Sequence, residues 1–183
     1  MKKFLSSPVF VFDIDNTLLD WSNPLVFLRS VPFTLTLAKQ KPQLDRLRGF
    51  RCSIDLPYPD GPSTFTIPTW LSPLFSHLVA THQRIAIFSD LPHYEMHPLF
   101  LEYGITTIIS AKDIQALKPL PDGLWQICSA LQCGCNQLVV IGDQRETDGL
   151  AAFRAGACYY PIQAIQYFGW ERFLHSIPQS FTI

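Results

Sequence analysis

The sequence carries little charge, and neither sign is in excess. Only 16% of its 183 residues are charged, and 14 Lys and Arg stand beside 15 Asp and Glu, for a formal net charge of -1. Proteins that bind nucleic acid need a basic stripe to neutralise phosphates, and no cluster of Lys and Arg long enough to form one occurs here. We therefore expect no nucleic-acid partner.

Long hydrophobic runs are missing as well, although 48% of the residues are hydrophobic. No stretch approaches the roughly 20 apolar residues that a membrane-spanning helix needs. The apolar run near the start of the chain ends at Asp13 and has no small-residue cleavage site, so it does not fit a secretory signal. We expect a cytoplasmic protein without a membrane span.

The sequence has no Cys-x-x-Cys pair, and its five cysteines are an odd number. Both facts argue against a disulfide framework and favour a reducing compartment. Cys133 and Cys135 are two positions apart, but two thiols without a nearby partner Cys or His make a weak metal site. We interpret this stretch as a plain loop.

What is present is an alternation of two kinds of stretch. Apolar runs of strand length alternate with segments whose apolar residues recur at helical spacing. The expected strands cover residues 9–12, 84–90, 105–110, 137–143 and 156–160. The expected helices cover residues 70–82, 93–103, 122–131 and 147–155. This order predicts an α/β fold, a Rossmann-like three-layer sandwich around a mostly parallel sheet.

One segment interrupts this alternation. Residues 30–69 are rich in proline and include the basic residues Arg46, Arg48 and Arg51, so we interpret them as an insertion in a single core domain. The arginines are candidates for substrate selection, although an exposed charged helix face is the commoner explanation.

Polar residues gather at the ends of the expected strands and in the loops beside them. They are Asp13, Asp15, Ser89, Lys118, Asp143 and Asp148. Parallel strands direct their carboxyl ends to the same edge of a sheet, where such folds bind ligands. Residues far apart in the chain can therefore surround one small ligand at that edge.

These residue types suit a phosphate ester. One carboxylate can attack phosphorus, and a second, two residues along and on the same side of the strand, can give a proton to the leaving alcohol. A hydroxyl and an ammonium can bind the phosphate oxygens. Because neighbouring acids repel each other, the set also favours a hard cation that prefers oxygen ligands, such as Mg²⁺.

In these motifs the sequence resembles the haloacid dehalogenase-like (HAD) hydrolase superfamily, whose four motifs occur in order. Residues 13–18 (DIDNTL) resemble motif one, Ser89 resembles motif two, Lys118 motif three and residues 142–148 (GDQRETD) motif four. The spacing within residues 118–123 and 142–148 is also similar to the small branch that contains phosphatidylglycerophosphate phosphatases.

The resemblance implies a role for each catalytic residue. Asp13 would be the nucleophile that forms an aspartyl-phosphate. Asp15 would act first as general acid and then as the base for the hydrolytic water. Ser89 and Lys118 would bind the phosphoryl group.

The resemblance also implies a bound Mg²⁺. The ion would be held by Asp13, the backbone carbonyl of Asp15 and Asp143. Asp148 would support the ion through water or orient Lys118.

By the same resemblance, residues 1–21 and 70–183 form the catalytic core and residues 22–69 a small inserted cap, the element that usually selects the leaving group. An acid at the position of Asp15 favours phosphatase or phosphomutase chemistry over dehalogenases and transport ATPases. We therefore expect a Mg²⁺-dependent phosphatase for a small phosphate monoester. A phosphomutase with the same residues and a catalytically retired binding protein stay open, as do the substrate and the oligomeric state.

Overall fold

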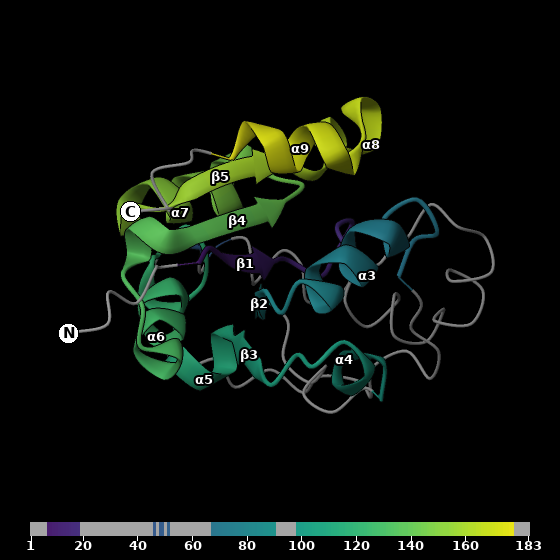
Figure 1. The fold of residues 1–183 in the computed structure, drawn as a ribbon. Helices are drawn as coiled ribbons and strands as arrows, with labels where there is room; N and C mark the ends of the chain where they lie inside the picture. Colours follow the sequence, from purple (N-terminus) through teal and green to yellow (C-terminus); the bar gives the residue numbers. More distant parts are fainter. Residues whose placement is uncertain are drawn as a thin grey trace, which may run out of the picture.

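A parallel β-sheet runs through the computed structural model, which describes residues 7–18, 46, 48–49, 51, 67–90 and 98–177 (Figure 1). Its strands are β1 (Val9–Phe12), β2 (Arg84–Ser89), β3 (Thr107–Ser110), β4 (Leu138–Gly142) and β5 (Cys158–Pro161). They lie in the order β3-β2-β1-β4-β5, and each of these pairings is parallel. β1 is therefore the central strand, and the chain crosses from one half of the sheet to the other after β3.

β1 forms a buried strand because β-branched and aromatic residues alternate along it. Its valines pack on one face of the sheet and its phenylalanines on the other. Phe10 pairs in register with Ile85 of β2 and with Val139 of β4. The strand is thus held on both edges and both faces, which determines where the next residue, Asp13, stands.

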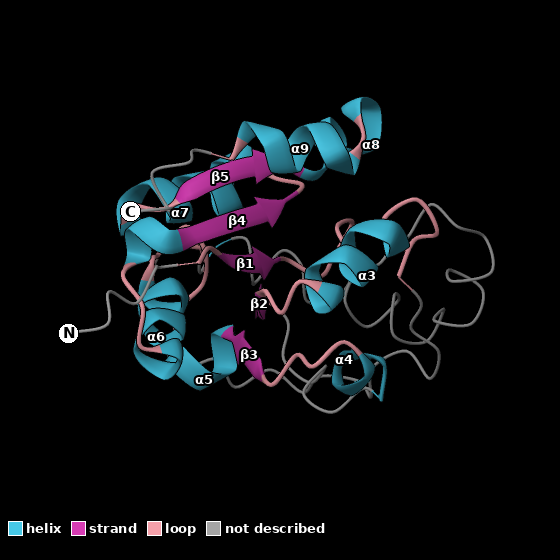
Figure 2. Cartoon of the chain, in the orientation of Figure 1, coloured by secondary structure: helices cyan, strands magenta, loops and turns pink. Residues whose placement is uncertain are grey.

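Helices cover both faces of the sheet (Figure 2). α3 (Ser72–Ala80), α8 (Ile162–Phe168) and α9 (Trp170–Ser176) pack on the face that carries the phenylalanines of β1. α6 (Asp122–Leu131) and α7 (Leu150–Ala155) pack on the opposite face. Two shorter helices, α4 (Pro98–Glu102) and α5 (Ala111–Ile114), precede and follow β3 in the chain. The predicted three-layer α/β sandwich with a parallel sheet is confirmed.

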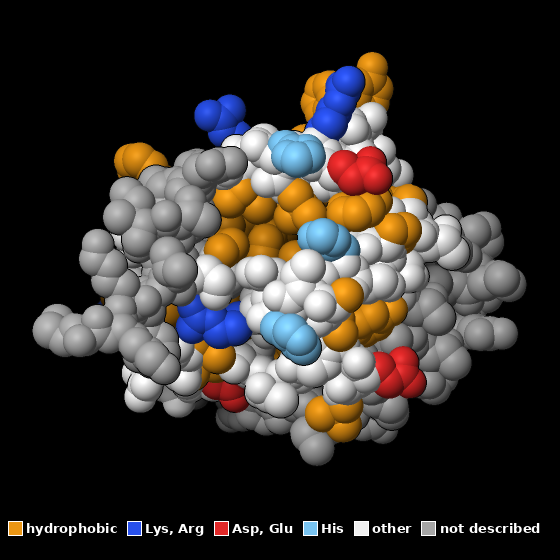
Figure 3. Space-filling model, viewed as in Figure 1, with side chains coloured by type: hydrophobic (Ala, Val, Ile, Leu, Met, Phe, Trp, Pro, Cys, Tyr) orange, Lys and Arg blue, Asp and Glu red, His pale blue; other side chains and the backbone are white. Residues whose placement is uncertain are grey.

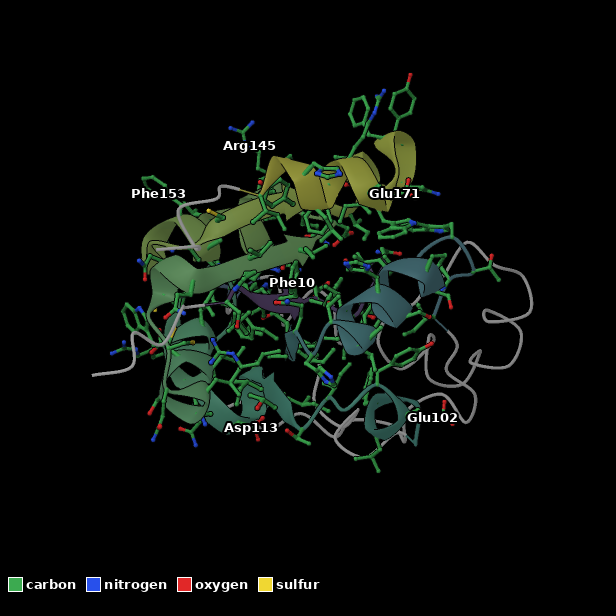
Figure 4. All side chains as sticks on the ribbon, viewed as in Figure 1. Phe10, Glu102, Asp113, Arg145, Phe153 and Glu171 are labelled. Carbon is green, nitrogen blue, oxygen red and sulfur yellow. The ribbon has the colours of Figure 1, made fainter. Side chains whose placement is uncertain are left out.

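Aromatic rings link the sheet to the helices of its first face. The ring centroids of Phe12 and Phe75 of α3 lie 4.7 Å apart, and those of Phe10 and Phe173 of α9 lie 6.2 Å apart. Figure 4 shows Phe10 in the middle of the molecule and Phe153 at its margin. Hydrophobic side chains gather in the middle of the face of the molecule that Figure 3 shows. Within the described ranges no helix has both the length and the hydropathy to cross a bilayer.

Some expected elements begin elsewhere. The helix expected over residues 147–155 starts earlier, as a π-helical turn, η2 (Arg145–Gly149), which continues into α7. The strand expected over residues 156–160 starts only at Cys158, because Gly156 adopts a φ of 77° and ends α7. Both shifts come from local backbone geometry that hydrophobic periodicity does not encode.

The predicted cap, residues 22–69, falls mostly outside the described ranges, so the division into core and cap stays a prediction. Two of its arginines contact the core. Arg51 forms an ion pair with Asp122 of α6 at 2.8 Å, and Nη1 of Arg48 donates a hydrogen bond to Oε1 of Gln144 at 3.2 Å. These contacts attach this part of the segment to the core.

Candidate active site

Asp13 stands directly after the central strand. Its backbone N–H donates to the carbonyl oxygen of Ile141 at 2.9 Å, which continues the pairing of β1 with β4 by one residue. Asp13 is only 8% exposed. A carboxylate buried to this extent requires a positively charged partner if it is to stay ionised.

Lys118 supplies that partner. Its Nζ donates to Oδ1 of Asp13 at 2.5 Å and to Oδ1 of Asp148 at 2.6 Å, and Lys118 itself is buried. The ammonium also lies 5.0 Å from the centroid of the Phe88 ring, which adds a cation–π attraction. One buried amine therefore bridges an acid that follows β1 and an acid from η2.

The loop that carries Lys118 is held by an acid that sequence reasoning missed. The backbone N–H of Lys118 donates to Oδ1 of Asp90 at 2.9 Å. Asp90 follows β2 directly, as Asp13 follows β1, so its place after an apolar strand was a usable signal. The peptide bond between Lys118 and Pro119 is cis.

Asp148 reaches the site from the π-helical turn η2. Its backbone N–H donates to the carbonyl oxygen of Gln144 at 2.8 Å, and its Oδ2 accepts from the N–H of Gln144 at 3.1 Å. Gly142 leaves room for this carboxylate, because a Cβ at that position would overlap it. The turn and the glycine together direct Asp148 toward Lys118. Sequence reasoning did not assign a role to Gln144.

Asp143 follows β4 and completes an acidic cluster. Carboxylate oxygens of Asp13, Asp143 and Asp148 all lie within 4.8 Å of one another. One cation can bridge oxygens at this spacing, and carboxylates are the donors that hard divalent ions prefer. No other group of three or more His, Cys, Asp or Glu residues is arranged in this way in the part of the chain that the structure describes. The residues present therefore fit a divalent metal ion.

Ser89 and Asp15 lie at the same edge of the sheet. Ser89 is the last residue of β2 and is buried, and β2 pairs with β1 through Ile87 and Phe12. Asp15 is half-buried, and its charge acts on Asp13, where it raises the pKa of that carboxyl. The structure thus places all the predicted site residues at the carboxyl-terminal edge of the sheet, with Asp13, Lys118 and Asp148 in direct contact.

Solved structures share this arrangement of strands and helices. A 2-haloacid dehalogenase from Pseudomonas syringae pv. Tomato DC3000 matches with a TM-score of 0.59 and 18% identity, over 84% of this chain and 85% of that one. A HAD phosphatase from Thermococcus onnurineus matches with a TM-score of 0.58 and 19% identity, over 83% and 84%. The cobalt-bound deoxy-D-mannose-octulosonate 8-phosphate phosphatase from Haemophilus influenzae matches with a TM-score of 0.51 and 13% identity, over 86% and 69%. The chain has the HAD fold.

The likeness at these identities concerns the HAD fold alone, and fold by itself does not determine function. No protein-family model matches the sequence, and no curated protein does either. The similarity to phosphatidylglycerophosphate phosphatases stays a prediction. The activity must therefore be argued from the chemistry of the site.

The electrostatics of this HAD-fold site favour an added cation. Burial raises the pKa of Asp13 well above its ordinary value, Lys118 opposes this rise, and Asp148 adds to it. Burial also raises the pKa of Asp143, and the charge of Asp148 raises it further. For Lys118, burial lowers the pKa, but the charges of Asp13 and Asp148 raise it by more, so the amine stays an ammonium. The cluster contains more acid than one amine neutralises, and a divalent ion would restore the balance.

Proposed function

We propose that this chain is a divalent-metal-dependent phosphatase that hydrolyses a small phosphate monoester, with Asp13 as the nucleophile. The observation that supports this most directly is the Lys118 ammonium, 2.5 Å from Asp13 and 2.6 Å from Asp148 at the carboxyl-terminal edge of a HAD-fold sheet. An anionic group that approaches Asp13 at this edge meets a fixed positive charge beside the attacking oxygen. The solved phosphatases that share the fold add support.

In the proposed reaction, a carboxylate oxygen of Asp13 attacks phosphorus, and the ester oxygen leaves with a proton from Asp15. The product on the protein is an aspartyl-phosphate. Asp15, now ionised, takes a proton from a water that attacks the same phosphorus, so the bond between phosphorus and the Asp13 oxygen breaks. Inorganic phosphate is released. Lys118 and Ser89 bind phosphoryl oxygens during both steps.

Asp13, Asp143 and Asp148 would hold the metal ion, together with the backbone carbonyl of Asp15. When bound, a divalent ion neutralises the repulsion between an anionic nucleophile and an anionic substrate. A donor set made only of oxygens favours Mg²⁺. The H. influenzae phosphatase of the same fold is a cobalt-bound form, which supports the use of a divalent metal.

The function is tested by the release of inorganic phosphate from a panel of phosphorylated metabolites, with Mg²⁺ and with EDTA. We expect hydrolysis of at least one small monoester, loss of activity in EDTA and recovery when Mg²⁺ is restored. Asp13→Asn should reduce turnover to the background rate and leave the fold intact, because the carboxamide has nearly the same size but is a poor nucleophile.

Glu146→Gln is the matched control, because Glu146 is an exposed acid two residues from Asp148 and should be dispensable. Wild-type turnover in Asp13→Asn, or full activity without any divalent ion, would contradict the proposal. Transfer of the phosphoryl group to a second hydroxyl without free phosphate would identify a phosphomutase instead. Halide release from a 2-haloacid would identify a dehalogenase, the activity named for the P. syringae protein.

A further inference from the structure

Three cysteines lie in or just after α6, next to the amino-terminal end of β4. The acidic cluster lies at the other, carboxyl-terminal edge of the sheet. Cys128 lies in α6, and Cys133 and Cys135 follow the end of that helix, just before β4 begins (Figure 1). Sγ of Cys128 and Sγ of Cys135 are 2.8 Å apart, and both thiols are free. Cys133 and Cys135 lacked a partner in the sequence, and the fold supplies Cys128.

The backbone between these thiols is held by hydrogen bonds. α6 ends at Leu131 and is capped by Gln132, which adopts a φ of 49°. The N–H of Cys133 donates to the carbonyl oxygen of Cys128 at 3.0 Å. The next turn is closed from both sides, because Gly134 donates to the Gln137 side chain at 2.8 Å and the N–H of Gln137 donates to the Gly134 carbonyl at 2.9 Å. The folded turn after α6 therefore places Cys135 next to Cys128.

We propose that Cys128 and Cys135 form a disulfide when the protein meets a small-molecule disulfide such as oxidised glutathione. A disulfide bond is about 2.05 Å long, so the two sulfur atoms need to approach by only about 0.75 Å. The site is separate from the acidic cluster and does not depend on the proposed phosphatase activity.

The reaction is a pair of thiol–disulfide exchanges. The thiolate of Cys135, the more exposed of the two residues, attacks one sulfur of the oxidant and releases one thiolate. Cys128 then loses its proton to solvent and attacks the Cys135 sulfur, which releases the second. Two protein thiols are oxidised, and one small disulfide is reduced to two thiols.

Burial raises the pKa of the Cys128 thiol, and its contacts with Cys135 and Cys133 raise it further. Only a small fraction of Cys128 is therefore thiolate at neutral pH, which slows the second exchange. We expect the cross-link to form slowly at neutral pH and faster as the pH rises.

The test uses the full chain, reduced, freed of reductant and incubated with oxidised glutathione. Chymotrypsin cleaves after Leu131, which lies between Cys128 and Cys135, so without reductant the two fragments stay joined only by a disulfide. Mass spectrometry should find the joined pair two hydrogens lighter than the separate fragments together, and fragmentation should place the bond at Cys135. Reductant should separate the fragments.

Cysteine-to-serine variants identify which two cysteines form the cross-link. Cys133→Ser and the matched control Cys158→Ser should form the cross-link like the wild type, whereas Cys135→Ser should lose it. Circular dichroism of the reduced variants checks that each is folded. Only glutathione adducts in the wild type, or a bond that joins Cys128 to Cys133, would overturn the proposal, and both results can be read from the wild type alone.

Discussion

At the scale of single residues, the site depends on one buried amine between two buried acids. Lys118 donates to Asp13 and Asp148, and the backbone of Lys118 is fixed by Asp90. Removing the amine would leave two carboxylates buried side by side without their positively charged partner. The cost of an unpaired buried charge is much larger than the net value of the pair itself.

Lys118→Met should therefore destabilise the protein by about 3–5 kcal/mol in urea unfolding at neutral pH. Methionine keeps an unbranched side chain and removes only the charge and the donors. The double variant Lys118→Met with Asp148→Asn should recover part of the lost stability, because it removes one of the two carboxylates that repel each other.

The control is Arg154→Met. Arg154 is exposed and donates to the carbonyl oxygen of Pro119, next to Lys118, at 3.0 Å. Because this contact lies on the surface, its loss should cost about 1 kcal/mol at most. Equal effects of the two substitutions would show that burial of the Lys118 charge is unimportant.

At the scale of elements, α6 and β2 meet closely beneath the site. Gly123 in the first turn of α6 faces the ring of Phe88 in β2, and a Cβ on Gly123 would overlap that ring. The same ring lies 5.0 Å from the Lys118 ammonium. The missing side chain therefore lets the helix approach the strand whose aromatic residue supports the amine.

Gly123→Ala should destabilise the protein by about 1–3 kcal/mol, the usual cost of overpacking a core. Alanine is a better helix former than glycine by about 1 kcal/mol, so helix propensity alone predicts the opposite sign. Ser129→Ala, at an exposed position of the same helix, should be neutral or slightly stabilising. The free energy of unfolding of both variants checks this, and a stabilised Gly123→Ala variant would show that Phe88 moves aside without cost.

At the scale of the whole molecule, the ends of β1 and β4 and the turn η2 bring together three carboxylates, more than the single Lys118 ammonium neutralises. The pKa of Asp13 is raised by burial and by Asp148, and the pKa of Asp143 is raised for the same two reasons. The folded protein thus binds protons more tightly than the unfolded chain at these groups. Without metal, their contribution to stability is favourable at low pH and is lost as the pH rises through their folded-state pKa values.

Added Mg²⁺ should reverse this trend. The ion binds ionised carboxylates, so its stabilising effect should be small in acid and grow toward neutral pH. At a hundredfold excess over its Kd, about 2.7 kcal/mol of stabilisation corresponds to a Tm increase of about 5–10 °C. Thermal unfolding at several pH values with EDTA or Mg²⁺ measures the effect. An increase in Tm that is absent, independent of pH, or unchanged in Asp143→Asn would argue against metal binding by this cluster.

The sequence by itself determined the strands and the order of the polar residues. Continuous apolar runs within Val9–Phe12 and Arg84–Ser89 encode buried strands locally. Asp13, Ser89 and Asp143 were predicted as site residues because they stand where such runs end. The gathering of these residues at one edge was predictable because parallel strands share an edge, and the HAD fold was predictable from the resemblance of the four motifs.

Only the tertiary structure decided which of these groups touch. Lys118 contacts Asp13 across 105 positions of the chain, and Asp90 holds its backbone. The meeting of Cys128 with Cys135 likewise depends on how the turn after α6 folds back before β4. Hydrophobic periodicity reports which face of an element is buried, whereas contacts between side chains depend on packing and loop geometry, and these are properties of the folded chain as a whole.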